Sequence, residues 1–377
     1  MSNKSEGLPS EPGRSGSEVI RSRRGAKELP KAMTMAAVAR SVGVSQGAIS
    51  SLLNDRDYGI RVSQKTRDRV VKACREMGYI PNDLRAIVRI YPELGDTCVL
   101  VPNTIPGGLA NPFLARVTEA VIANTTRKPA TISVILYEEA RVYGVEELPT
   151  PIKHGIVSKI ICMGRANASI CEVVHDRRLP AILLGHSSPI PGTTSVVADF
   201  PEAASLSLRL LVRHGHSHIG IVGDPFGSPE PRMSEIDNAI GHVAHELGLQ
   251  IDAQDVFHGD LSFDAGVAAL ESLLARDSAP TAVICLSEAS ATGVMARAQA
   301  RGISIPGQLS VLAFVDHPGT PATSVPLTTV VIPAGELGAA AVKEAERQVR
   351  EGIPETAARV VVGVELIERS SCGPAAK

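Results

Sequence analysis

The sequence predicts a small all-α domain joined through a short linker to a larger α/β body with two lobes. Residues 33–81 contain three short helical segments with cap residues and no strand pattern. From Thr97 onward, short apolar runs rich in Val and Ile alternate with helical segments, which is typical of buried parallel strands with helices on both faces. This second part spans about 275 residues, enough for two such lobes.

The net charge differs in sign between the first quarter of the chain and the rest. The formal net charge is −2, but residues 1–91 hold 17 Lys and Arg against 9 Asp and Glu, a balance of +8. Residues 92–377 hold the other 21 basic and 31 acidic residues, a balance of −10. A basic first quarter on an acidic body is typical of a nucleic-acid-binding module attached to a regulatory or catalytic body. A basic tail without any particular role is the alternative that charge alone leaves open.

Composition argues against several classes of protein. No apolar run approaches the roughly 18 residues of a membrane-spanning helix, and residues 1–32 lack the hydrophobic block of a signal peptide. We therefore expect a cytoplasmic protein without a membrane partner. The cysteines are scattered and form no CxxC pair, so neither a zinc knuckle nor a disulfide framework is expected, and the thiols should be reduced and mostly buried. They are Cys74, Cys98, Cys162, Cys171, Cys285 and Cys372.

The first domain follows an arm and consists of short capped helices. Residues 1–32 are rich in Ser, Gly, Pro and charge without an apolar period, so we expect a disordered basic arm. Thr34 should cap a first helix (MAAVARSV), which Gly43 should end. A second helix follows over SQGAISSLLN, and after a loop Ser63 should cap a third, QKTRDRVVKACREM, which Gly78 stops. Three helices so close together predict a small bundle.

The first two helices carry the spacing of a helix-turn-helix. Ala39 is small where the helices would cross, Gly43 supplies the positive φ of the turn, and Ile49 would anchor the second helix on the first. A helical hairpin that only packs is the alternative. If the second helix enters a major groove, Gln46 can make the bidentate contact that suits adenine. The predicted DNA contacts of this domain are Thr34, Ser45, Gln46, Gly47, Ala48, Ser50, Ser51 and Asn54.

Residues 82–95 predict a hinge helix and a linker. In NDLRAIVRI, Leu84 and Val88 lie four residues apart on one helical face, with Arg85 and Arg89 nearby. An apolar wedge flanked by arginines is typical of side chains that enter a minor groove. Leu84, Val88 and Arg89 are therefore further predicted DNA contacts. An amphipathic linker helix that packs on its own protein is the alternative.

In the body, strands and helices are expected to alternate to the end of the chain. Helices are expected from 111, over 201–215, up to 248, over 264–277, up to 302 and over 335–352. Strands are expected over 98–103, 131–137, 157–164, 180–186, 218–224, 281–287, 309–316 and 359–367.

These segments resemble the lac-repressor (LacI/GalR) family of bacterial transcription regulators. The resemblance runs from Thr34 to about Ser371 and rests on VARSVGVSQGAISSLLN, VSQKTRDRVV, GYIPN, NPFLARVTEAV, RHGHSHIGIVGD, GISIPGQLSV, PLTTVVIPAGELGAAAV and VELIERSS. It implies a sequence-specific repressor that binds a palindromic DNA operator as a homodimer, through helix-turn-helix headpieces and hinge helices. Ser51 stands where the family usually has an arginine, and Val88 is smaller than the usual leucine, so the family's operator preferences are not expected to carry over.

The resemblance also implies a body like that of periplasmic sugar-binding proteins, with a small effector between the lobes and allosteric control of the hinge helices. The body would span 96–372, and the chain would pass between the lobes near Val197, Pro326 and Pro354. The first lobe would consist of about 97–196 and 327–353, and the second of about 197–326 and 354–371.

The effector residues are carried over by motif. Arg232 matches the residue with which the family grips its ligand, and a guanidinium suits hydroxyls or a carboxylate. Leu261 stands at the usual aromatic platform, and Val315 stands where an aspartate usually holds ligand hydroxyls. The effector is therefore unidentified, with a sugar-like molecule as one option and a body that responds to no ligand as the alternative. The expected effector residues are Phe113, His186, Arg232, Leu261, Ser287 and Val315.

Two other classes of function remain alternatives. His214, His216 and His218 alternate, so on a strand they would face one way and could bind zinc, but they stand at the entry into a predicted strand. No GxSxG, HExxH or GxxxxGK[ST] motif occurs in a persuasive context. A pure solute-binding protein would normally need to be exported, and the attached helix-turn-helix argues against this class. We expect neither an enzyme nor a metal or cofactor site.

Overall fold

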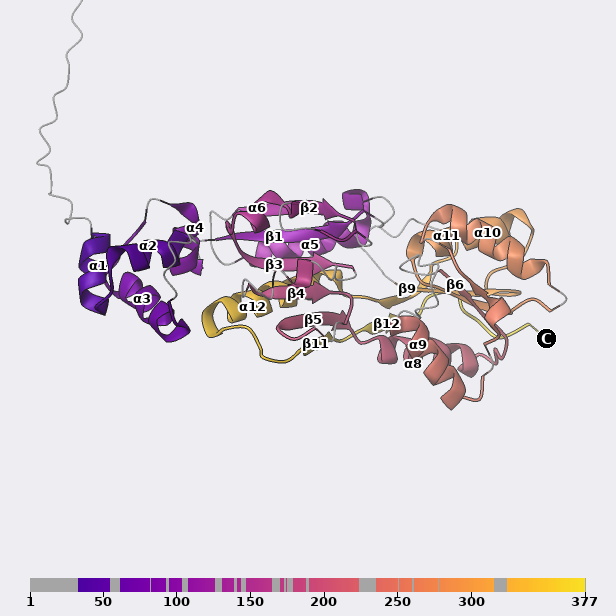
Figure 1. Cartoon of the computed structure of the whole chain (residues 1–377). Coiled ribbons are helices and arrows are strands. Elements are labelled where there is room, and N and C mark those ends of the chain that lie inside the picture. Colours follow the sequence, from indigo (N-terminus) through magenta and orange to yellow (C-terminus); the bar gives the residue numbers. More distant parts are fainter. Residues whose placement is uncertain are drawn as a thin grey trace, which may run out of the picture.

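The computed structural model arranges the chain as a helical headpiece, a first lobe and a second lobe (Figure 1). The headpiece, in indigo, and the second lobe, in orange, lie at opposite ends of Figure 1 with the first lobe between them. No described helix combines the length and the hydrophobicity that crossing a bilayer requires. The described residues are 33–54, 62–81, 83–92, 95–103, 108–125, 131–138, 141–143, 147–164, 170–172, 174, 179–187, 190–223, 235–249, 251–259, 261–276, 278–314 and 324–376. The predicted arm, residues 1–32, lies outside them.

The helices of the headpiece begin and end at the predicted cap residues. Thr34 Oγ1 accepts a hydrogen bond from the Ala37 N–H, and Ser63 Oγ accepts one from the Thr66 N–H. Gly43 ends the first helix with a φ of 75°, a left-handed conformation that glycine adopts without steric cost. These predictions are confirmed. The described helices are α1 (Met35–Val42), α2 (Gln46–Asn54), α3 (Gln64–Glu76) and α4 (Leu84–Ile90).

The headpiece has a hydrophobic core of its own. Ala39 and Ile49, the residues of the helix-turn-helix spacing, are both buried in it, which confirms their predicted packing roles. Cys74 of α3 and Ala86 and Ile90 of α4 join the same core. The headpiece can therefore hold α2 in place without help from the body.

The first lobe is built on a six-stranded sheet with the strand order β11-β5-β4-β3-β1-β2. All of its pairings are parallel, as the apolar runs predict. The helices α5 and α12 pack so closely that a Cβ on Gly338 would lie 2.7 Å from the Val117 carbonyl oxygen. Its elements are β1 (Asp96–Pro102), η2 (Gly108–Ala110), α5 (Pro112–Asn124), β2 (Ile132–Tyr137), α6 (Thr150–Lys153), β3 (Val157–Met163), β4 (Ala181–Leu184), β5 (Thr193–Ala198), α12 (Ala334–Glu351) and β11 (Ala358–Val362).

The second lobe repeats this plan with the order β12-β10-β9-β8-β6-β7. Only β12 runs antiparallel to its neighbour in this sheet. A Cβ on Gly266 or Gly293 would collide with the backbone of the facing helix, so α10 and α11 cross at these two glycines. Its elements are α8 (Phe200–Arg213), β6 (Ile219–Val222), α9 (Glu235–Glu246), η4 (Ala253–Asp255), β7 (Val256–Phe257), α10 (Phe263–Leu274), β8 (Ala282–Cys285), α11 (Glu288–Ala300), β9 (Ser310–Phe314), β10 (Thr328–Val331) and β12 (Glu365–Ile367).

The chain passes between the lobes at positions that differ from two of the three predictions. The first passage follows β5, close to the predicted Val197. The second lies after β10 rather than at Pro326, because β10 pairs with β9 of the second lobe. The third lies between β11 and β12 rather than at Pro354, so the single strand predicted over 359–367 is two strands in two sheets. The prolines lie in connecting segments, but backbone pairing with distant strands decides which sheet a strand joins.

The thiols are arranged as the composition suggests. All six cysteines are buried and free, which confirms the expectation that they are mostly buried. Burial raises the pKa of Cys74 to about 11 and that of Cys98 to about 12, because the charged thiolate is disfavoured away from water.

Candidate DNA-binding and effector sites

The N-terminal half of α2 is the most exposed part of the helix-turn-helix. Ser45, Gln46 and Gly47 are exposed, while Ile49 and Leu53 are buried in the headpiece core. Ser45 Oγ accepts a hydrogen bond from the Ala48 N–H at 3.1 Å, so this hydroxyl also caps α2. The helix therefore presents a short polar face on a rigid base. Of the other predicted contacts, Thr34 is exposed, Ala48, Ser50 and Ser51 are half-buried, and the Asn54 side chain lies outside the described part.

Three arginines of the headpiece donate to carbonyl groups near helix C-termini. Arg69 Nη2 donates to the carbonyl oxygen of Val42, the last residue of α1, at 2.8 Å. Arg75 donates to the carbonyl oxygen of Ile90 at the end of α4, and Arg89 donates to that of Leu52 in α2. Such bonds satisfy carbonyl groups that have no partner within their own helix. Arg89, predicted to contact DNA, thus joins the hinge helix to α2.

The hinge helix α4 packs on its own headpiece. Ala86 and Ile90 are fully buried, and the Tyr91 hydroxyl lies 3.3 Å from the Tyr79 carbonyl oxygen, to which it can donate. Val88, the predicted minor-groove wedge, is only 7% exposed, so its side chain is not available to a groove in this conformation. The side chain of Leu84, the other predicted apolar contact, lies outside the described part.

The predicted effector residues come from both lobes, at the ends of parallel strands where ligands of α/β proteins bind. In the second lobe, Ser287 Oγ donates to the Leu261 carbonyl oxygen at 2.8 Å and caps α11, so these two residues lie together. In the first lobe, Phe113 is the second residue of α5, and His186 follows β4. Arg232 and Val315 lie outside the described residues.

The structure also brings together residues that the sequence did not single out. The carboxylate of Glu235, at the start of α9, accepts a hydrogen bond from the Ser187 N–H at 3.0 Å. It also lies 3.1 Å from Arg359 Nη2. Glu235 belongs to the second lobe, and its two partners belong to the first. No local signal in the sequence marks these residues, because their proximity depends on how the two lobes meet.

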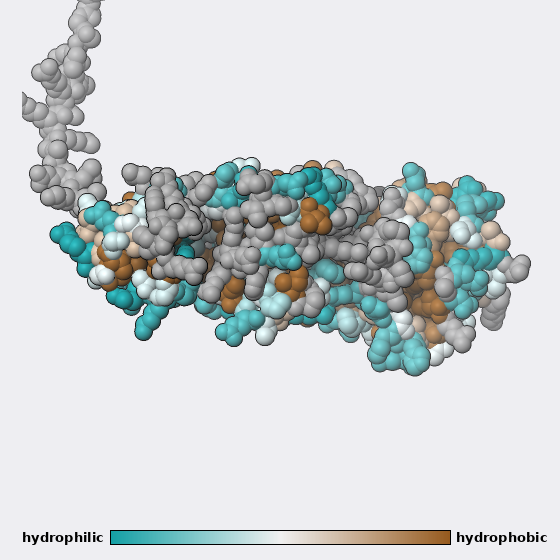
Figure 2. Space-filling view, in the orientation of Figure 1, coloured by the Kyte–Doolittle hydropathy of each residue, from teal (hydrophilic) through white to brown (hydrophobic). Residues whose placement is uncertain are grey.

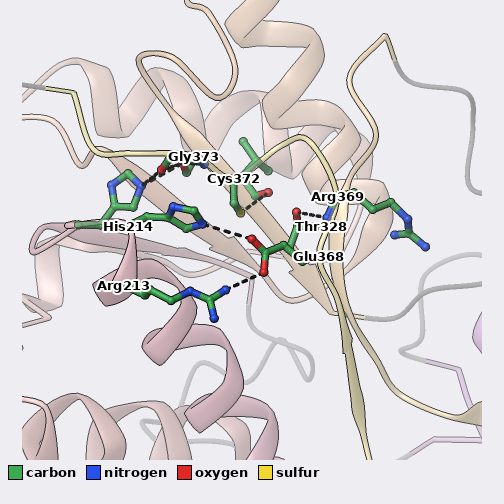
Figure 3. Close-up of polar contacts among 10 residues, drawn as sticks. Arg213, His214, Thr328, Glu368, Arg369, Cys372 and Gly373 are labelled. Atoms are coloured by element: carbon green, nitrogen blue, oxygen red, sulfur yellow. Dashed lines mark hydrogen bonds and ion pairs between the residues drawn. The ribbon is translucent and has the colours of Figure 1, made fainter.

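The three alternating histidines lie between the end of α8, where His214 is the C-cap, and the start of β6, so the alternative in which they face one way along a strand is wrong. His214 Nε2 lies 3.5 Å from Glu368, a carboxylate that also pairs with Arg213 at 2.6 Å (Figure 3). His218 Nε2 lies 2.9 Å from the buried carboxylate of Asp255. The histidines thus have separate partners, and the described residues hold no group of three or more His, Cys, Asp or Glu suited to a metal ion.

His216 holds the C-terminal segment of the chain on the second lobe. Its ring nitrogens lie 2.9 Å from Thr281 Oγ1, 3.0 Å from Ser310 Oγ and 3.0 Å from the Gly373 carbonyl oxygen. The side chain is only 3% exposed, and this burial lowers the pKa of His216 below its ordinary value. A bond to the Gly373 carbonyl opposes the shift, and the nearby His214 adds to it.

A patch of exposed apolar side chains lies on α5 and β2 of the first lobe, over which small hydrophobic areas stand among hydrophilic ones (Figure 2). Ile122 of α5 and Leu136 of the edge strand β2 are 55% and 60% exposed, and Val134 beside them is 38% exposed. An open depression joins the two elements, lined by Ala115, Thr118, Glu119, Ile122 and Val134. Large apolar side chains grouped in this way are typical of interaction surfaces.

Two stretches of the chain match known families. Residues 34–82 match "Bacterial regulatory proteins, lacI family", and residues 189–372 match "Periplasmic binding protein-like domain". The chain is 28% identical over 320 residues to the HTH-type transcriptional repressor CytR of Escherichia coli (strain K12), covering 83% of this chain and 89% of that one. It is 25% identical over 313 residues to catabolite control protein A of Priestia megaterium, covering 82% and 91%.

Solved structures share the fold. A lac repressor dimer bound to operator and the anti-inducer ONPF superposes with a TM-score of 0.62 at 23% identity, covering 90% of this chain and 99% of that one. A complex of the transcriptional regulator CelR with cellobiose gives a TM-score of 0.62 at 21% identity, with the same coverage. The helix-turn-helix, the two-sheet body and the family matches together show a lacI-family DNA-binding domain followed by a periplasmic-binding-protein-like body, and the chain is similar over most of its length to transcriptional repressors such as CytR.

Proposed function

We propose that the chain is a repressor that binds a palindromic operator as a homodimer and responds to a small molecule held between its lobes. The observation that carries this proposal is the exposed polar face of α2, in which Gln46 stands on a helix anchored by the buried Ile49. A rigid helix with polar side chains at its start can read base edges in a major groove. Residues 33–81 would form the DNA-binding headpiece, 82–95 the hinge and linker, and 96–372 the body.

The apolar surface on α5 and β2 supports the dimer. An edge strand with exposed Val134 and Leu136 leaves both backbone groups and apolar side chains uncovered, and a second copy of the chain would cover them. A dimer also explains how two short recognition helices can give specificity, because each would read one half of a palindrome. Because the proposed role is operator binding, we propose a cytoplasmic protein without catalytic activity.

The effector proposed here is a small polar molecule that is not held by aromatic stacking. Leu261 occupies the position of the expected platform, and the chain contains no Trp. The Ser287 hydroxyl is not available to donate a hydrogen bond to a ligand, because it already donates to the Leu261 carbonyl oxygen. Cellobiose, present in one solved neighbour, and common hexoses are the first probes for a thermal-shift screen. Tight binding of a hexose would contradict this description of the effector without affecting the proposed DNA binding.

Selection of binding sites from random DNA tests the main proposal. The full chain is expected to enrich a palindrome, with a flexible pyrimidine–purine step at its centre if the hinge helices kink the duplex. A chain that lacks residues 1–91 keeps the separate cores of the body and should enrich nothing. Enrichment of one non-symmetric site would contradict the dimer, and specific binding by the shortened chain would contradict the assignment of DNA binding to the headpiece.

A further inference from the structure

A carboxylate side chain of the second lobe contacts the first lobe directly. Glu235 begins α9, a helix that packs on α8 of the second lobe. Its side chain extends to the first lobe, where Oε1 accepts a hydrogen bond from the Ser187 N–H and Oε2 pairs with Arg359. The two oxygens of one carboxylate thus bind two different elements of the opposite lobe. A side chain in this position couples the lobes directly.

The first lobe presents these donors as a small site for a carboxylate. Ser187 follows β4, and Arg359 lies on β11. Both of these strands pair with β5. The Ser187 hydroxyl oxygen is buried next to this site, and the described residues offer it no hydrogen-bond partner. A backbone N–H combined with a guanidinium is a common arrangement for binding a carboxylate, because both bonds are charge-assisted.

We propose that Glu235 is a tethered carboxylate that fills this site and holds the two lobes in one relative orientation. Apolar packing and three chain passages also join the lobes, and such passages can act as hinges. The side chain of Glu235 is 24% exposed and that of Arg359 is 46% exposed, so the ion pair alone is weak. In the second interaction, a carboxylate oxygen of Glu235 accepts the hydrogen bond from the Ser187 N–H. This bond does not involve Arg359. Removal of both interactions should therefore affect lobe orientation more than removal of the charge alone.

The test measures the distance between the lobes in the full chain. Spin labels at Lys343→Cys on α12 and Ser272→Cys on α10 report on the first and second lobe, and both positions are exposed. The native cysteines are buried, so the introduced thiols are labelled selectively. Glu235→Gln keeps an acceptor but loses the charge, and is expected to raise the population of other lobe distances roughly 2- to 5-fold. Glu235→Ala loses both and should raise it roughly tenfold or more.

Two variants serve as controls. Glu271→Gln makes the same chemical change in a carboxylate that pairs with Arg297 and Arg301 inside the second lobe, and it should leave the distances unchanged. Ser187→Ala removes a hydroxyl but keeps the backbone N–H, so it should also leave them unchanged. A Glu235→Ala chain that is folded and has the wild-type distance distribution overturns the proposal, and so does an equal change in Glu271→Gln.

A charge exchange tests the ion pair by itself. Glu235→Arg combined with Arg359→Glu restores the ion pair with its partners exchanged. The double variant should have a distance distribution closer to wild type than that of either single change. If it is no closer, the proposal is overturned. The measurement requires no DNA, so its failure leaves the proposed repressor function untouched, and the operator selection tests that function separately.

Discussion

Val88 packs against Gly95 so closely that a Cβ on residue 95 would lie 2.9 Å from Val88 Cγ1. The same Cβ would lie 2.6 Å from Ser158 Cβ, so the hinge helix, the linker and β3 meet at this glycine. The hinge helix is thereby fixed both to the headpiece and to the start of the body. If Val88 enters a minor groove, it must first leave this contact.

Val88→Ala is expected to weaken operator binding about 5- to 10-fold, because a shorter side chain is a poorer wedge between base steps. Fluorescence anisotropy at matched salt measures the affinity. Ile87→Val is the control, since it removes one methylene from a neighbouring half-buried side chain of the same helix. An unchanged affinity for Val88→Ala would remove the wedge role from this residue.

Gln46→Ala is expected to relax base preference at one position of each half-site and to cost about 1 to 3 kcal/mol of binding free energy. The reason is the loss of a bidentate contact from the exposed start of α2. Site selection followed by affinity measurement on single-base variants provides the readout. Gln64→Ala, at an exposed glutamine of α3 that bonds Asp68 at 2.8 Å, should leave the preference intact. Equal effects of the two variants would contradict the assignment of α2 as the reading helix.

Gly43→Ala is expected to destabilise the headpiece by about 1 kcal/mol. The cost arises from the φ of 75° alone, because a Cβ at this position would meet no atom within 4 Å. Hydrogen exchange of the α1 and α2 amides measures the local stability, and their protection should fall about fivefold. Gly43→Asn should cost less, since Asn tolerates the left-handed conformation. A larger loss for Asn than for Ala would argue against backbone strain as the cause.

Leu136→Asp is expected to raise the dimer dissociation constant about 30-fold or more. The proposed interface would have to bury an uncompensated carboxylate, which costs several kcal/mol. Sedimentation velocity over a concentration series gives the constant. Val361→Asp is a matched control, because Val361 is 51% exposed on β11, the strand at the opposite edge of the same sheet. If Val361→Asp dissociates the dimer and Leu136→Asp does not, the interface lies on the other edge.

His216 is expected to make the second lobe less stable in acid. Its pKa is lower in the folded protein than its ordinary value of 6.5, so the unfolded chain binds the proton more readily. Stability is therefore full above about pH 6.5 and falls as the pH drops below that value. Urea unfolding should show a lower free energy of unfolding at about pH 5.5 than at about pH 7.5, and His216→Gln should reduce this difference. His242→Gln is the matched substitution at an exposed histidine, which pairs with Glu246.

The features that the sequence predicted well depend on neighbours along the chain. Thr34, Gly43 and Ser63 act through hydrogen bonds and backbone angles within a few residues, so their cap roles follow from local chemistry. The burial of Ile49 follows from helical spacing in the same way. The two-lobed fold was predictable because most of the buried strands carry an apolar run. The strands β5 and β10 begin with threonines and were not among the predicted strands.

The features that were missed depend on contacts between distant segments. The assignment of β10 and β11 to opposite lobes depends on pairing with β9 and β5, which no apolar pattern specifies. The contact of Glu235 with Ser187 requires the lobes to be placed relative to each other. For Val88, helical spacing correctly indicated an apolar face, but it could not distinguish a face toward DNA from one packed on Gly95. Among the described residues, Leu261 and Ser287 are the two predicted effector residues joined by a hydrogen bond.

The three passages between the lobes also bear on how the protein is made. The first lobe needs β11, residues 358–362, to complete a sheet whose other strands lie between residues 96 and 198. Neither lobe is therefore a continuous stretch of chain, and neither sheet can close until residues far along the sequence have left the ribosome. The headpiece, whose described helices end by residue 90, has no such delay. We therefore expect a nascent chain to carry a folded headpiece before it has a body.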